Sequence, residues 1–138
     1  MMLSGPEYAF LSCRRVGHLA TADSAAKPHV VPVCFAIGEH TLYTALDEKP
    51  KRTRDPKRLK NIRENPDVVF LADRYDEDWS RLGWVMIRGG AEILEEGDIF
   101  RLGGLPLQER YPQYRSMMLM PVIAVRILQV RSWGNLDE

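Results

Sequence analysis

The apolar residues of this chain gather in six short runs that have the composition of β-strands. The clearest run, 28–37, reads PHVVPVCFAI, and both of its alternating faces are largely apolar. Such a strand is buried on two sides, or it borders a barrel interior and a partner surface. Pro32 cannot donate to a strand ladder, so we expect it at a bulge or at a sheet edge. The other strand-like runs are 18–22, 41–46, 67–73, 84–94 and 121–133.

Helical patterns are few and short. The segment 6–15 suits an amphipathic helix whose packed side chains are Tyr8, Leu11 and Cys13. A second helix is predicted between an Asp-Pro pair at 55–56, which supplies an N-cap and a first-turn proline, and an Asn-Pro pair at 65–66, which stops it. Glycines and prolines divide residues 95–120 into what we interpret as two short helices.

Six strands with few helices favour a small antiparallel barrel over an alternating βαβ sheet, which makes the fold class mainly β, of the α+β type. Within the run 84–94, Gly89-Gly90 predicts a bulge, a bend or a close backbone approach. A chain of 138 residues with 45% hydrophobic content suits a single domain over residues 1–138. Without a basic leader or an apolar run that reaches across a bilayer, we expect no membrane contact and a cytoplasmic location.

Charge adds the first hint of chemistry. Of the 19 Lys and Arg residues, 8 lie between Lys49 and Arg63, although the formal net charge of the chain is zero. Such crowding creates a local positive field that attracts an anion. An overall neutral chain with a pI near 6.8 argues for a compact anion site rather than nucleic-acid binding. The alternative is a solvated helix face, to which we assign Arg58 and Arg63.

A phosphate is the anion that this stretch suits. The chain contains no GxGxxG and no GxxxxGK[ST] motif, so charged side chains have to replace a glycine-rich cradle. The candidate ligands are Lys49, Lys51, Arg52 and Lys60, with hydroxyl and backbone donors from Thr44 and Ala45 at the end of a strand.

Other chemistry is sparse. Cys13 and Cys34 are far apart in sequence, so we expect two reduced thiols packed as small apolar groups. The three histidines lack metal-ligand spacing, and no metal site is predicted. The polar segment RYDEDWSRLGW at 74–84 carries Trp79 and Trp84. Such a segment commonly contacts a ligand or another subunit. The alternative interpretation is a solvated turn with aromatic side chains in the core.

Three ordered motifs together resemble a known family. They are GHLATADSAAKPHVVPVCFAIGEHTLYTALDEK at 17–49, LKNIRENPDVVFLADRY at 59–75 and WVMIRGGAEIL at 84–94. This order is similar to the pyridoxamine 5'-phosphate oxidase-like flavoproteins, which form a six-stranded antiparallel split β-barrel of the FMN-binding type with short peripheral helices. The resemblance is strongest to the small subgroup that uses the deazaflavin coenzyme F420.

The resemblance also implies a site. The family forms homodimers with cofactors in grooves between the subunits, so Val31, Pro32 and Val33 would line the cofactor ring. Thr44, Ala45, Lys49, Lys51, Arg52 and Lys60 would lie on its phosphate side. Trp79 and Trp84 would point toward the cofactor pocket of the partner subunit. The chain lacks the Arg-x-His pattern of the phosphate oxidases themselves, which argues against oxidation of pyridoxine phosphate.

The activity that follows is hydride transfer between coenzyme F420 and a small organic substrate, with no catalytic side chain assigned. In such an oxidoreductase the cofactor carries the chemistry and the protein supplies placement and exclusion of water. Two alternatives stay open: an FMN-binding flavoprotein, and a carrier or sensor that binds a flavin without turnover.

Overall fold

The computed structural model of the protein describes residues 3–46, 56–117, 119 and 121–138. Three α-helices are present in this part of the chain: α1 (Gly5–Ser12), α2 (Lys57–Glu64) and α3 (Gly97–Arg110). Two 3-10 helices, η1 (Trp79–Arg81) and η2 (Pro112–Ser116), add to them. The strands are β1 (Gly17–Ala22), β2 (Pro28–Val33), β3 (Ala36–Ile37), β4 (Thr41–Ala45), β5 (Asp67–Arg74), β6 (Gly83–Leu94) and β7 (Val122–Gly134).

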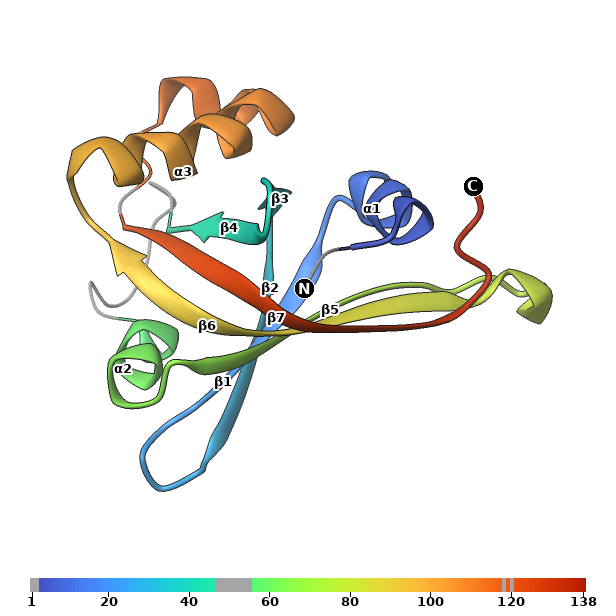
Figure 1. Cartoon of the computed structure of the whole chain (residues 1–138), viewed down its shortest axis with the longest axis horizontal. Helices are drawn as coiled ribbons and strands as arrows, with labels where there is room; N and C mark the ends of the chain where they lie inside the picture. The colour runs from blue at the N-terminus through green and yellow to red at the C-terminus, as the bar shows by residue number, and fades with distance from the viewer. Residues whose placement is uncertain (1–2, 47–55, 118, 120) are drawn as a thin grey trace.

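All seven strands form one antiparallel sheet in the order β2-β1-β5-β6-β7-β4-β3. The strands β2 and β3 form its two edges, yet only Cys34 and Phe35 separate them in the chain. The sheet therefore has to curl until its edges approach each other, and Figure 1 shows the resulting half-barrel. This shape is consistent with the split barrel that the resemblance implied. The predicted number of six strands was wrong, because the run 28–37 breaks at this corner.

Two groups of buried side chains hold the half-barrel. The larger group fills its interior from β1, β5, β6 and β7, and α1 contributes Phe10 and Leu11 to it. The smaller group joins α3 and η2 to the other side of β4 and β7 through Leu107, Tyr111 and Tyr114. In Figure 1, α3 accordingly stands over β4 at one end of the sheet, and the connection between β5 and β6 lies at the opposite end.

Two predictions about special residues in strands are confirmed. Pro32 lies in β2, an edge strand, where the missing N–H interrupts no second ladder. The pairing of β6 with β7 changes register between Arg88 and Gly89, as expected of a bulge. A Cβ atom at Gly89 would overlap the backbone carbonyl of Arg126 and the side chain of Val125, so this position is also a close backbone approach.

The first helix differs from its prediction. Helix α1 begins at Gly5 behind a capping box, in which the Ser4 hydroxyl accepts from the Glu7 N–H and the Glu7 carboxylate accepts from the Ser4 N–H. Its buried residues are Phe10 and Leu11, whereas Tyr8 is half exposed. Cys13 follows the helix and is exposed, so the expectation of a packed thiol was wrong there. Cys34 is partly buried, and both thiols are free.

Helix α2 ends at Glu64, as its Asn-Pro stop signal predicted, and begins one residue later than expected. Pro56 occupies the N-cap position without a side-chain hydrogen bond, and Asp55 lies outside the described residues. The prediction of a side-chain cap and a first-turn proline is therefore not met at Pro56.

A single helix replaces the two short helices predicted for 95–120. Helix α3 continues through Gly103, Gly104 and Pro106, and only the short η2 follows it. Packing explains this outcome: Leu107 is fully buried, and a Cβ atom at Gly103 would lie 2.9 Å from Val122 Cγ1. The glycine that we took as a separator instead lets the helix approach β7 closely. None of the helices in the described ranges is long and apolar enough to cross a membrane.

Candidate functional site

The edge strand β2 and the strand β4 meet at the corner between β2 and β3. The Thr44 hydroxyl donates to the Cys34 carbonyl oxygen at 2.8 Å, which ties β4 to the end of β2. Val33 belongs to the interior core and Val31 packs against it. The interior side of this corner is therefore apolar, with Val33 only 6% exposed in the core and Val31 partly buried beside it.

The predicted residues of these two strands do not all face the same side. Side chains alternate along a strand, so Pro32 is exposed on the outer face while Val31 and Val33 face inward. In β4, Thr44 is buried and 2% exposed, and its hydroxyl donor is already used. Ala45 packs on the opposite side, with the group formed by α3. The structure thus brings Val31, Val33 and Thr44 to one side of the corner and separates Pro32 and Ala45 from them.

Helix α2 places basic residues beside the hairpin of β1 and β2. Leu59 and Ile62 anchor the helix in the core, and Lys60 is exposed on its surface. Lys49, Lys51 and Arg52 lie outside the described residues, so their predicted role stays a prediction.

Three polar contacts fix α2 against the hairpin. The Asn61 side chain, which is fully buried, donates from Nδ2 to the Thr21 hydroxyl at 3.0 Å. The Glu64 carboxylate accepts from the N–H and the hydroxyl of Ser24, at 3.0 and 2.8 Å. Lys57 pairs with Asp23 at 3.4 Å. The basic face of α2 is consequently held in place relative to β2, rather than attached through a loose loop.

The aromatic segment between β5 and β6 is not packed into the core. Tyr75 is 65% exposed and Trp79 is 70% exposed, so the interpretation of aromatic side chains in the core was wrong for this loop. An ion pair between Arg81 and Asp76, at 3.1 Å, helps to order it. Trp84 is partly buried and lies opposite Trp133 in the sheet.

The same segment is remote from α2 within one subunit. The strand β5 begins after α2 and ends before the aromatic segment, and its 8 residues span roughly 25 Å at about 3.3 Å per residue. Trp79 would therefore reach the basic region only from a second copy of the chain.

The corner itself is held by two side chains, Arg110 at the end of α3 and Tyr111 after it, which no sequence motif predicted. The Tyr111 hydroxyl accepts from the Phe35 N–H at 3.0 Å and lies 2.8 Å from the Arg15 carbonyl oxygen. Arg110 Nη1 donates to the Phe35 carbonyl oxygen at 2.8 Å, and its guanidinium lies 4.4 Å from the Phe35 ring centre. Both backbone groups of Phe35 are thus satisfied by side chains, where a ladder partner is missing. We call Arg110 and Tyr111 the corner clasp.

Arg110 also ends helix α1. Its Nη2 atom donates to the carbonyl oxygens of Leu11 and Ser12, both at 3.1 Å, and contacts that of Arg14. A guanidinium at a helix C-terminus satisfies carbonyl groups that have no partner within the helix. Burial lowers the pKa of Arg110 and raises the pKa of the Tyr111 phenol from their ordinary values. No spacing rule links positions 75 to 99 residues apart, so the contacts of Arg110 were not predictable from local pattern.

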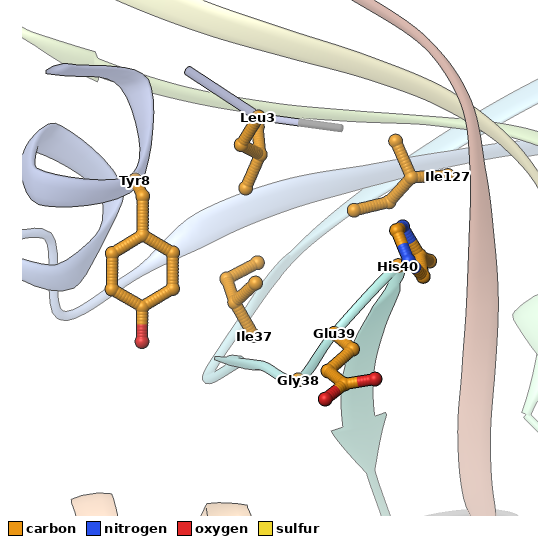
Figure 2. A pocket seen from close by; sticks show the side chains of 7 residues that line it. All are labelled: Leu3, Tyr8, Ile37, Gly38, Glu39, His40 and Ile127. Carbon is orange, nitrogen blue, oxygen red and sulfur yellow. The ribbon is translucent and has the colours of Figure 1, made fainter. Parts of the chain in front are cut away.

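A hollow opens at the turn between β3 and β4, and Figure 2 shows the side chains around it. Its volume is about 630 Å³. The residues that line it are Leu3, Tyr8, Ile37, Gly38, Glu39, His40 and Ile127, and we call it the β3–β4 hollow. None of the predicted site residues that the structure describes lines it. In the described ranges, no three His, Cys, Asp or Glu side chains group so as to hold a metal ion.

Comparison with solved structures supports the fold. A conserved hypothetical protein from Mycobacterium tuberculosis is 27% identical, with a TM-score of 0.71, over 97% of this chain and 86% of that chain. The haem storage protein HutZ from Vibrio cholerae is 14% identical, with a TM-score of 0.73, over 97% and 95% of the two chains. An FAD-binding protein from Mesorhizobium loti is 23% identical, with a TM-score of 0.68, over 96% and 95%.

Comparison of the sequence with curated proteins gives no significant match. The family model described as pyridoxamine 5'-phosphate oxidase matches residues 8–134, which is nearly the whole chain. That match confirms the family predicted from the three ordered motifs, in a chain whose sheet is curled into a half-barrel. The chain therefore belongs to the pyridoxamine 5'-phosphate oxidase family.

Proposed function

We propose that this protein is an oxidoreductase that binds a flavin-type cofactor, and that coenzyme F420 is this cofactor. The observation that carries the proposal is the apolar inner face of β2, at Val31 and Val33, in an edge strand whose hairpin with β1 holds the basic helix α2, in a chain of zero net charge. Family membership supports the flavin-type cofactor, and the similarity to an FAD-binding protein is in keeping with it.

The described residues fit such a cofactor in two respects. Val31 and Val33 offer an apolar wall, and Lys60 adds a positive charge on a helix that polar contacts hold against the same hairpin. A bound flavin or deazaflavin supplies hydride transfer. Val31 and Val33 keep water from one side of the ring, while Lys60, Lys49, Lys51 and Arg52 bind the phosphate. The Thr44 hydroxyl already donates to the Cys34 carbonyl oxygen, so Thr44 stabilises the corner and is not assigned to the phosphate.

The protein acts in this proposal as a cytoplasmic homodimer. The outer face of the sheet supports a dimer because it presents apolar side chains side by side, with Val30 opposite Ala20 and Leu71 opposite Met86. Val30 is 62% exposed, which is unusual for a β-branched side chain in a sheet.

Titration of the purified protein with coenzyme F420 and, separately, with FMN tests the cofactor. Tight binding of F420 with weak binding of FMN supports the proposal. A protein that is yellow as purified and has no affinity for F420 is instead an FMN flavoprotein. Stable binding without oxidation or reduction of any compound in a substrate panel identifies a carrier, and failure to bind either cofactor refutes the cofactor assignment.

The phosphate ligands are tested by combining Lys49→Ala with Lys51→Ala. We expect a weaker cofactor affinity, by about tenfold or more, because charge-assisted contacts to a phosphate are lost while no described core residue changes. The control removes two exposed cations away from this hairpin, Arg115→Ala with Arg126→Ala, and leaves the affinity unchanged. Equal affinities of the two double variants would place the phosphate elsewhere.

A further inference from the structure

The β3–β4 hollow is separate from the proposed cofactor groove. Strand β4 begins at Thr41, next to the hollow, and ends at Ala45, next to Thr44, whose hydroxyl holds the corner at Cys34. Its 5 residues span about 13 Å at about 3.3 Å per residue. The hollow and the contact between Thr44 and Cys34 therefore lie at opposite ends of one strand. The volume of about 630 Å³ falls within the range of roughly 300–1,000 Å³ that is usual for small-molecule sites.

The walls of the hollow are built from rigid parts of the fold. Leu3 and Ile37 pack against the interior core, and Ile127 is 3% exposed within that core. Figure 2 shows these three side chains around a common space, with Tyr8 from α1 on one side and Glu39 and His40 on the other. An apolar group that enters the hollow thus meets three aliphatic side chains whose positions are already fixed.

The rim is equally well ordered. The Gly38 N–H donates to the Thr41 carbonyl oxygen at 2.8 Å, which closes the turn. The Ile127 N–H donates to the His40 carbonyl oxygen at 2.9 Å, which ties the turn to β7. A preorganised rim lowers the entropic cost of binding because little has to be immobilised when a ligand arrives.

Three polar groups at this rim have no protein partner among the described residues. They are the hydroxyl of Tyr8, the carboxylate of Glu39 and the imidazole of His40, and no hydrogen bond or ion pair joins any of them to the rest of the described chain. A mostly apolar hollow with a few unused polar groups at its rim is the usual composition of a ligand site. The charge of the rim indicates which ligand fits, because Glu39 supplies the one carboxylate among the described residues that line the hollow, and none of them is Lys or Arg.

We propose that the β3–β4 hollow is a second ligand site that takes a small amphipathic cation, an apolar group of about one ring that carries a protonated amine. The apolar group lies against Leu3, Ile37 and Ile127. The ammonium group lies at the rim, where it donates to the Glu39 carboxylate. This preference is opposite to that of the basic segment, so an anionic flavin is not expected here. The site exists whether or not the cofactor assignment is correct.

Three probes of nearly equal size and different charge test the proposal. They are 2-phenylethylamine as the cation, 2-phenylethanol as the neutral analogue and 3-phenylpropanoate as the anion. Each is titrated into the isotope-labelled protein, and the backbone amide signals of Gly38, Glu39 and Ile127 are followed by NMR. We expect all three amides to move with the amine, less with the alcohol and least with the carboxylate.

A matched pair of variants assigns the charge preference. Glu39→Gln should weaken amine binding about two- to fivefold, as for an exposed ion pair, and should leave the alcohol unaffected. Glu95→Gln removes an exposed carboxylate outside the hollow and should change neither affinity. An amine that moves none of these amides, or binds no more tightly than the carboxylate, overturns the proposal. FMN that moves the same amides would make the hollow part of the cofactor groove and would overturn its assignment as a second site.

Discussion

The hydroxyl of Tyr111 offers the sharpest test of how the half-barrel is closed. Tyr111→Phe removes a single oxygen atom and retains the ring that packs beside Tyr114, with ring centres 5.5 Å apart. The cation–π contact of Arg15, whose guanidinium lies 4.9 Å from the Tyr111 ring centre, also survives. Any loss of stability therefore reports the hydrogen bonds of that hydroxyl, and not the packing of the ring.

The expected magnitude follows from the three partners of the hydroxyl, which are the Phe35 N–H and the carbonyl oxygens of Arg15 and Phe35. The Phe35 carbonyl oxygen keeps its bond from Arg110, so its loss adds little. The buried Phe35 N–H loses its acceptor, at 3.0 Å, and no strand replaces it at this corner. A buried donor left without a partner costs about 1–3 kcal/mol. The Arg15 carbonyl oxygen is only part-buried and regains a bond from water, so its loss adds little. We expect Tyr111→Phe to lower the free energy of unfolding by about 1–3 kcal/mol.

Urea denaturation of the cofactor-free protein measures this change, at one fixed protein concentration because the proposed dimerisation would contribute to apparent stability. Tyr75→Phe is the matched control: that hydroxyl is exposed and has only a long contact, at 3.4 Å, from Trp79, so a change below about 0.5 kcal/mol is expected. Hydrogen exchange should quicken at the Phe35 amide in Tyr111→Phe alone. Equal stability of the two variants, with the Phe35 amide still protected, would refute the idea that the corner clasp closes the half-barrel.

Two further predictions concern helix α3 and the hairpin of β1 and β2. Gly104→Ala should stabilise the protein by up to about 1 kcal/mol, since nothing lies within 4 Å of the added methyl group. Gly103→Ala should destabilise the protein, because its methyl group would press on Val122. Thermal unfolding compares the two variants. Backbone N–H groups hold the pKa values of Asp23 and Glu64 below their ordinary values, so their stabilisation is complete above about pH 5 and is lost as the pH falls through the lowered values. The urea midpoint should fall over that range, and less so in Asp23→Asn; a midpoint with no dependence on acid pH would contradict this.

Most strands were determined by the sequence, because alternation between apolar and polar residues directly reflects which face of a strand is buried. The bulge at Gly89 and the edge position of Pro32 were predictable for a related reason. In each case the residue type itself restricts the backbone conformation or hydrogen bonding at its own position, so the prediction needs no knowledge of distant contacts. The family followed from the order of three such motifs.

Tertiary structure decided what local pattern does not encode. Whether the run 28–37 is one strand or two depends on a corner at Phe35 whose backbone is satisfied by Tyr111, about 75 residues away. Packing against β7 similarly carries α3 through Gly103, which local propensity marks as a break. The β3–β4 hollow exists only because α1, the turn and β7 converge around it. Burial and side-chain hydrogen bonds between distant segments outweigh local preferences of a fraction of a kcal/mol per residue, so these features become visible only in the folded chain.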